Sequence, residues 1–127
     1  MKIEKTNNSP SVYLSIEDKV FDISGNAFSD FSNDIFADVL EWIDVNIPGL
    51  ESELVCKFSL DVFNSVTYKN ILNILHKFEI FNKKGKKISV VWYCKPDDED
   101  MYELAFDMKE LYNIPFEIRK EDTALKI

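Results

Sequence analysis

Two hydroxyl side chains, Ser65 and Thr67, lie where an alternating strand pattern gives way to a long amphipathic helix pattern. The first backbone N–H groups of a helix have no acceptor within the helix, and the helix dipole is positive there, so an oxygen or a phosphate is stabilised at that point. Ser and Asn are also common helix N-caps, so either Ser65 or the preceding Asn64 can cap this helix. The residues alone therefore allow two interpretations, an ordinary cap and an anion site, and they favour the cap.

His76 is the only histidine of the chain and thus the single candidate base for a Ser–His–Asp or Cys–His arrangement. It lies in the same predicted helix as Ser65, two turns or more further along, so the two side chains cannot touch. A solvated helix histidine is the expected interpretation. The sequence does not combine a nucleophile, an activating base and an oxyanion hole, and we expect no catalytic residue and no enzyme activity.

Four consecutive acidic residues are the one candidate metal site, since carboxylate oxygens bind Mg²⁺ and Ca²⁺: Asp97, Asp98, Glu99 and Asp100. The segment lacks the glycine and the spaced ligands of an EF-hand loop. It precedes a predicted helix, whose N-terminus favours acidic side chains. We expect no metal there, and the absence of phosphate-loop and dinucleotide-binding motifs predicts no cofactor.

The composition limits the class of protein. The 127 residues are 46% hydrophobic and 13% aromatic with three glycines, which suits one domain with a substantial core. The formal net charge of −8 argues against nucleic acid as a partner. The clustered lysines follow a predicted helix end, where cations complement the dipole: Lys83, Lys84, Lys86 and Lys87.

The cysteines and the hydropathy suggest a cellular location. Cys56 and Cys94 lie far apart in strand-like surroundings, so we expect buried free thiols. Residues 1–10 are polar, and nowhere do 18 apolar residues run together, so neither a signal peptide nor a membrane span is predicted. We expect a cytoplasmic protein without a membrane partner.

Hydrophobic periodicity predicts the elements that position these residues. Five segments have the alternation or the β-rich composition of strands: residues 11–16, 19–24, 53–63, 88–93 and 116–119. Three segments have helical spacing, of which the first begins at a cap on Ser32 or Asn33 and ends at Pro48, the second runs over 65–82 and the third over 101–111. Gly85 is the expected C′ residue of the second helix.

The order of these elements predicts an α/β fold. Strands separated by helices pair in parallel through right-handed crossovers. One face of the 53–63 strand is polar, with Lys57, Ser59 and Asp61, so that face is not covered by helices. We therefore predict a single domain over 1–127 with a mixed five-stranded sheet and three main helices packed mostly on one face. The residues expected in the core include Phe58, Leu60, Leu72, Leu75, Val90 and Leu104, and the aromatics Trp42, Trp92, Tyr93 and Phe106.

Several short segments form an ordered set along most of the chain: Ser-Pro-x-Val at 9–12, Val-Leu-Glu-Trp-Ile at 39–43, Phe-Asn-Ser at 63–65, Asn-Ile-Leu at 73–75, Val-Trp-Tyr at 91–93, Asp-Asp-Glu-Asp-Met at 97–101 and Pro-Phe-Glu at 115–117. Each is weak alone. Together they resemble the SiaC-type regulatory phosphoproteins, small STAS-like relatives of the anti-sigma-factor antagonists. The resemblance implies a STAS-like single domain. It is altered before the first helix, where Ser29 and Phe31 depart from the family's pattern.

The resemblance also implies a function. In that family a phosphorylatable threonine follows the asparagine, so by position the acceptor is Ser65, with Thr67 as the alternative because Val66 lies between them. A cognate serine/threonine kinase and a phosphatase would control the site in c-di-GMP signalling and biofilm regulation. The resemblance implies that the unmodified form binds and activates a diguanylate cyclase. Phosphorylation would block this binding, because a phosphoryl group adds ~1.5 to 2 negative charges to an apolar docking face. The implied docking residues are Asn64, Ser65, Val66, Thr67, Tyr68 and Lys69.

Two alternatives stay open. The same kind of module can act as an anti-sigma-factor antagonist that binds an anti-sigma kinase, and the sequence does not separate this partner from a cyclase. A different class, a small acidic metal-binding protein or enzyme that uses residues 97–100, is disfavoured by the missing base and nucleophile.

Overall fold

Residues 1–121, which the computed structural model describes, form a mixed sheet of six strands that follow one another in chain order. The first three strands are antiparallel neighbours: β1 (Lys2–Ile3), β2 (Ser11–Ser15) and β3 (Val20–Ala27). The other three continue the sheet in parallel to β3: β4 (Leu54–Phe63), β5 (Ile88–Cys94) and β6 (Phe116–Lys120). The predicted hairpin and the parallel pairing of strands separated by helices are confirmed.

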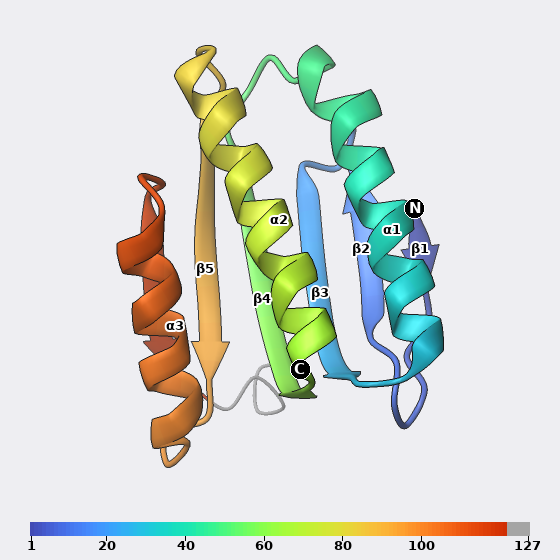
Figure 1. Cartoon of the computed structure of the whole chain (residues 1–127). Helices are drawn as coiled ribbons and strands as arrows, with labels where there is room; N and C mark the ends of the chain where they lie inside the picture. The colour runs from blue at the N-terminus through green and yellow to red at the C-terminus, as the bar shows by residue number, and fades with distance from the viewer. Residues whose placement is uncertain (122–127) are drawn as a thin grey trace.

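The helices of this part of the chain, α1 (Asp30–Asn46), α2 (Ser65–Lys83) and α3 (Glu99–Leu111), cover one face of the sheet (Figure 1). A 3₁₀ turn, η1 (Ile47–Gly49), follows α1. Since each helix begins after a parallel strand has ended, all of them start at the same edge of the sheet. The predicted α/β fold with helices on one side is confirmed, and ligands of such sheets commonly bind at that edge.

The sheet has six strands and not the predicted five. β1 is the strand that was missed, a two-residue segment that pairs Lys2 with Tyr13 and Ile3 with Val12. Two residues cannot show a period of two, and the polar sequence around them gave no other signal of a strand. Pairing with β2 therefore determines this strand.

The start of α1 also differs from the prediction. Its N-cap is Ser29, whose side chain accepts a hydrogen bond from the backbone N–H of Ser32, and not Ser32 or Asn33. Ser32 is instead buried and donates its hydroxyl hydrogen to the carbonyl of Asn8. The predicted end of α2 is confirmed, because Gly85 follows the C-cap with a φ of +98° that favours glycine.

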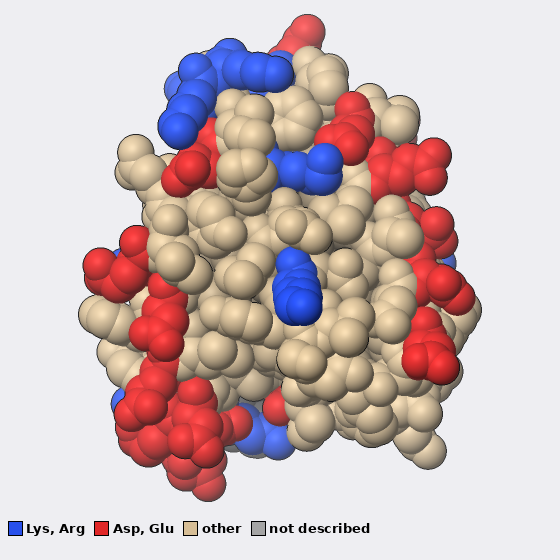
Figure 2. All heavy atoms as spheres, in the orientation of Figure 1, with Lys and Arg blue, Asp and Glu red and all other residues tan. Residues whose placement is uncertain are grey.

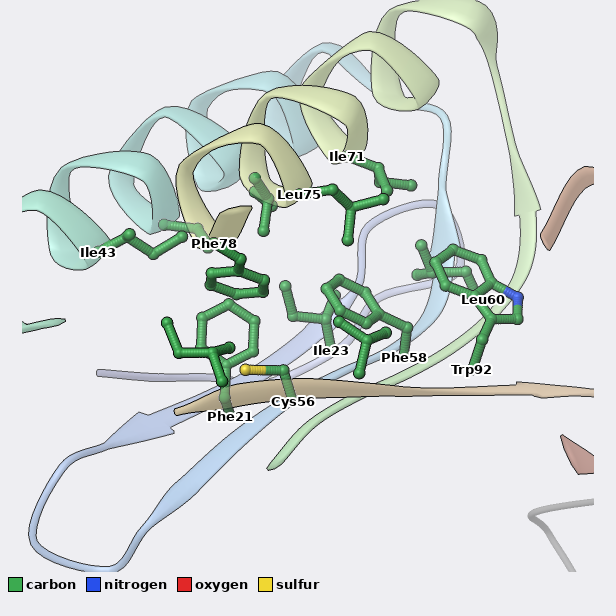
Figure 3. Packing of buried hydrophobic residues seen from close by; sticks show 14 of the residues in the cluster. Phe21, Ile23, Ile43, Cys56, Phe58, Leu60, Ile71, Leu75, Phe78 and Trp92 are labelled. Atoms are coloured by element: carbon green, nitrogen blue, oxygen red, sulfur yellow. The ribbon is translucent and has the colours of Figure 1, made fainter. Parts of the chain in front are cut away.

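An aromatic cluster fills the space between the sheet and α2 (Figure 3). Phe58 of β4 stacks on Trp92 of β5 with ring centroids 5.2 Å apart, and Phe21 of β3 meets Phe78 of α2 edge-on at 5.4 Å. All four side chains are fully buried. These contacts between chain-distant residues fix α2 over the middle of the sheet.

Most of the predicted core is buried. Phe58, Leu60, Leu75 and Val90 are confirmed, as are Trp92 and Tyr93, but Leu72, Leu104 and Trp42 are only half-buried and Phe106 is 45% exposed. The helices rest on the sheet through narrow stripes, Ile71, Leu75 and Phe78 in α2 and Met101, Ala105 and Met108 in α3. One residue further along a helix is rotated by 100°, so neighbours of a stripe lie on its flank.

The remaining expectations concern the polar face and the thiols. Lys57 and Asp61 are exposed on the face that the helices leave open. Cys56 and Cys94 are buried free thiols as predicted. Burial raises the pKa of the Cys56 thiol well above its usual value, so the thiol stays protonated and inert. Among residues 1–121, no helix combines the length and the apolar character that crossing a membrane requires.

Candidate phosphorylation and docking site

Asn64, and not Ser65, caps α2. The Asn64 backbone is extended, its side-chain oxygen accepts a hydrogen bond from the Thr67 N–H at 3.0 Å, and its carbonyl accepts from the Tyr68 N–H at 3.0 Å. Ser65 is therefore the first residue of the helix, and its exposed side chain is not needed as the cap. The cap of α2 is thus Asn64, and the exposed Ser65 stays the candidate phospho-acceptor.

The hydroxyl of Thr67 has a structural contact. It is buried and donates a hydrogen bond of 2.7 Å to the carbonyl of Ala27, the last residue of β3. A kinase would have to pull this side chain out of the fold before it could act on it. Accessibility therefore favours Ser65 over Thr67 as the acceptor, which stays a prediction.

The connection from β3 to α1 lies against the start of α2. The side-chain amide of Asn64 donates to the carbonyl of Phe28 at 3.4 Å. The carbonyl of Asn8 holds this connection from the other side, because it accepts from the backbone N–H groups of Phe28 and Ser29 and from the Ser32 hydroxyl. These hydrogen bonds form a framework that holds the backbone of Phe28 next to Asn64, the residue before Ser65.

Exposed apolar side chains surround this framework. Phe28 is 44% exposed, Val66 is 47% exposed, and Phe31, the second residue of α1, is 55% exposed. We refer to Phe28, Phe31 and Val66 as the α1–α2 patch. Figure 2 shows an uncharged area at the lower right, near the place where Figure 1 puts the start of α1, although Asp30 and Asp34 in the first turns of that helix are exposed. Clustered exposed apolar side chains of this kind are typical of a protein-binding surface.

The other predicted docking residues differ in exposure. Lys69 is exposed and Tyr68 is half-buried. Partial burial raises the pKa of the Tyr68 hydroxyl, and the nearby carboxylate of Asp107 in α3 raises it further. Asn64, Ser65, Val66 and Lys69 can therefore contact a partner directly, Tyr68 in part, and Thr67 only supports them from inside.

The other sequence candidates lie away from this site. His76 is exposed in α2, roughly 16 Å along the helix axis from Ser65, and its ring faces that of Tyr112 at 6.3 Å. In the acidic run, Asp98 caps α3 by accepting from the Met101 N–H at 3.0 Å, and Glu99 pairs with Lys120 at 3.9 Å. Within residues 1–121, no three His, Cys, Asp or Glu side chains are grouped as a metal ion requires.

Sequence reasoning missed two parts of the site, the aromatic side chains of the patch and the contact to Ala27. The presence of Phe28 and Phe31 among polar residues was the one available signal. The bond between Thr67 and Ala27 joins residues forty positions apart, and only the pairing of β3 with β4 brings them together.

The described residues thus form a one-sided α/β domain in which the exposed hydroxyl of Ser65 lies beside exposed apolar side chains, an arrangement that suits a small protein-binding domain. The model of the family described as SiaC family regulatory phosphoprotein matches residues 3–121, so this chain belongs to the SiaC family. An uncharacterized protein of Pseudomonas aeruginosa is 22% identical over 122 residues, which are 96% of this chain and 97% of that protein.

Solved structures show the same fold. Apo-SiaC from Pseudomonas aeruginosa superposes with a TM-score of 0.85 at 22% identity, covering 94% of this chain and 97% of that one. A chain of the crystal structure of the diguanylate cyclase SiaD in complex with its activator SiaC, from the same organism, gives 0.89 at 21% identity, covering 95% and 99%.

Proposed function

We propose that this chain is a non-enzymatic regulatory phosphoprotein whose unmodified form binds and activates a diguanylate cyclase, and whose phosphorylation on Ser65 prevents that binding. Membership of the SiaC family supports the regulatory role. The similarity to the structure of SiaD with its activator SiaC supports the choice of a cyclase as partner. The observation that carries the proposal is the exposed Ser65 beside the α1–α2 patch, with the neighbouring Thr67 hydroxyl buried.

The position of Ser65 explains how a phosphoryl group can act without unfolding the domain. The N–H groups of the first helical turn lack intrahelical acceptors, and Asn64 satisfies that of Thr67. A phosphate on Ser65 is compatible with the remaining N–H groups and with the positive end of the helix dipole. The folded state therefore tolerates the modification.

The same group is costly in a complex. A partner that covers Phe28 and Val66 removes water from the space next to Ser65. Desolvation of a doubly charged phosphate costs several kcal/mol unless new partners compensate it. Phosphorylation therefore lowers the affinity for a partner whose contact surface is apolar.

In this proposal the chemistry of the cycle is carried out by other proteins. A cognate serine/threonine kinase adds the phosphoryl group and a phosphatase removes it. Docking uses Asn64, Ser65, Val66 and Lys69 together with the patch, and needs neither cofactor nor metal.

The test is activation of the cyclase. Purified cyclase is assayed with unmodified chain, with chain treated by the kinase, and with Ser65→Ala treated in the same way. Unmodified chain and Ser65→Ala should stimulate, and phosphorylated chain should not. Loss of stimulation by kinase-treated Ser65→Ala would reject Ser65 as the switch, and binding to an anti-sigma kinase without any effect on the cyclase would favour the antagonist alternative.

A further inference from the structure

The charges of the helix-covered face are arranged in two columns. Figure 2 shows acidic side chains along both sides of this face, over α1 and over α3, and between them, over α2, an uncharged surface interrupted by basic side chains, since α2 contains Lys69, Lys77 and Lys83. α1 contains five acidic residues and no basic one: Asp30, Asp34, Asp38, Glu41 and Asp44. α3 contains five acidic residues and one lysine: Glu99, Asp100, Glu103, Asp107 and Glu110, with Lys109. We call these the α1 margin and the α3 margin.

Most of this negative charge is not compensated inside the protein. Among the ion pairs of residues 1–121, Asp44 pairs with Lys77 at 2.9 Å and Glu99 with Lys120 at 3.9 Å, and the other acidic residues of the two margins form none. The Debye length is about 10 Å at 0.1 M salt, so a surface that docks between the margins feels both of them.

We propose that the partner's docking surface has an apolar centre and carries Lys or Arg side chains on two sides, facing the α1 margin and the α3 margin. This inference rests on the proposed function for the identity of the partner, the diguanylate cyclase, and adds the chemistry by which it is recognised. The α1–α2 patch supplies the apolar contact. Basic side chains on the partner are attracted by the two margins, whereas neutral ones are not attracted and acidic ones are repelled.

This arrangement determines which rate constant phosphorylation changes. At long range a basic partner is attracted by negative charge, so a phosphate on Ser65 does not slow the encounter. At contact the phosphate must lose its water beside Phe28 and Val66. Phosphorylation therefore acts by speeding dissociation.

The experiment measures association and dissociation rate constants of the full chain with its cyclase between about 0.02 M and 0.5 M salt. Three double variants each remove two charges: Asp34→Asn with Glu41→Gln in the α1 margin, Glu103→Gln with Asp107→Asn in the α3 margin, and Glu51→Gln with Glu53→Gln as the matched control. Glu51 and Glu53 are exposed near Lys84 and Lys87, at the opposite end of α2 from Ser65. Thermal melts verify that each variant is folded.

Each margin variant should associate more slowly than wild type by about threefold to tenfold at low salt, with the difference vanishing at high salt and the control unchanged. Equal effects of the margin and control variants, or association that does not depend on salt, would overturn the inference while leaving the proposed function intact. Failure of the wild-type chain to bind the cyclase under any condition would reject the proposed function and this inference with it.

Discussion

The hydroxyl of Thr67 donates a 2.7 Å hydrogen bond to the carbonyl of Ala27, forty residues earlier in the chain. The bond is buried and joins the first turn of α2 to the end of β3. Two hydroxyls that are two residues apart in sequence thus have different environments, one inside the fold and one, on Ser65, in solvent. Because of this difference, Ser65 carries the accessible hydroxyl and Thr67 does not.

Thr67→Val should destabilise the fold by about 1–3 kcal/mol, because it leaves the buried carbonyl of Ala27 without its donor. Thr67→Ser keeps the hydroxyl and should cost less. Denaturant unfolding of the two variants measures the difference. Equal stability of Thr67→Val and wild type would show that the bond contributes nothing.

Asn64→Ala should cost about 0.5–2 kcal/mol, since the side chain of Asn64 is the N-cap of α2. Ser65→Ala should change the free energy of unfolding much less, because Ser65 is the first helical residue. Urea titrations of both variants compare them directly. A larger loss for Ser65→Ala than for Asn64→Ala would reverse the assignment of the cap.

Leu75→Ala should destabilise the fold by about 2–5 kcal/mol, because Leu75 lies on the side of α2 that faces the sheet and is fully buried there. Leu72→Ala in the same helix is the matched comparison, and its cost should be clearly smaller since Leu72 is half-buried on the flank. Calorimetric melting of both proteins gives the two values. Similar losses would mean that the flank of α2 is as tightly packed as its stripe.

Phe28→Ser and Val66→Ser should each weaken binding to the cyclase by about tenfold or more while the protein stays folded. Phe28 is 44% exposed and Val66 47% exposed in the free protein, so a partner can contact about half of each side chain, and the lost internal packing should lower the melting temperature only moderately. Leu111→Ser, at a 59% exposed position at the end of α3, is the control. Titration calorimetry provides the affinities, and an equal effect of the control would remove the patch from the interface.

The sequence was sufficient for those parts of the fold that depend on local periodicity. The alternation of residues 53–63 identified β4 close to its observed bounds. The helical spacing of apolar residues did the same for α2: Tyr68, Ile71, Leu72, Leu75, Phe78 and Phe81. The cap of α1 was missed because Ser29 and Ser32 are equally good caps one turn apart. What distinguishes them is the contact of Ser32 with the carbonyl of Asn8, twenty-four residues away.

The site was predictable to the same extent. Asn64, Ser65 and Thr67 could be placed at a helix start from the sequence, but their exposure could not be assigned. The burial of Thr67 depends on its hydrogen bond to the carbonyl of Ala27. The apolar surroundings of Ser65 depend on Phe28, whose carbonyl accepts a hydrogen bond from the Asn64 amide. Contacts between distant segments leave no periodic signal in the chain.

Phosphorylation of Ser65 should switch off partner binding, and both events can be measured on a single preparation. The chain is phosphorylated to completion by its kinase, the acceptor is located by phosphopeptide mass spectrometry, and the cyclase is titrated with the same preparation before and after the reaction. We expect label on Ser65 alone, binding by the unmodified chain, and an affinity at least about a hundredfold lower after phosphorylation. Label on Thr67 with Ser65 unmodified, or equal affinities before and after modification, would contradict this expectation.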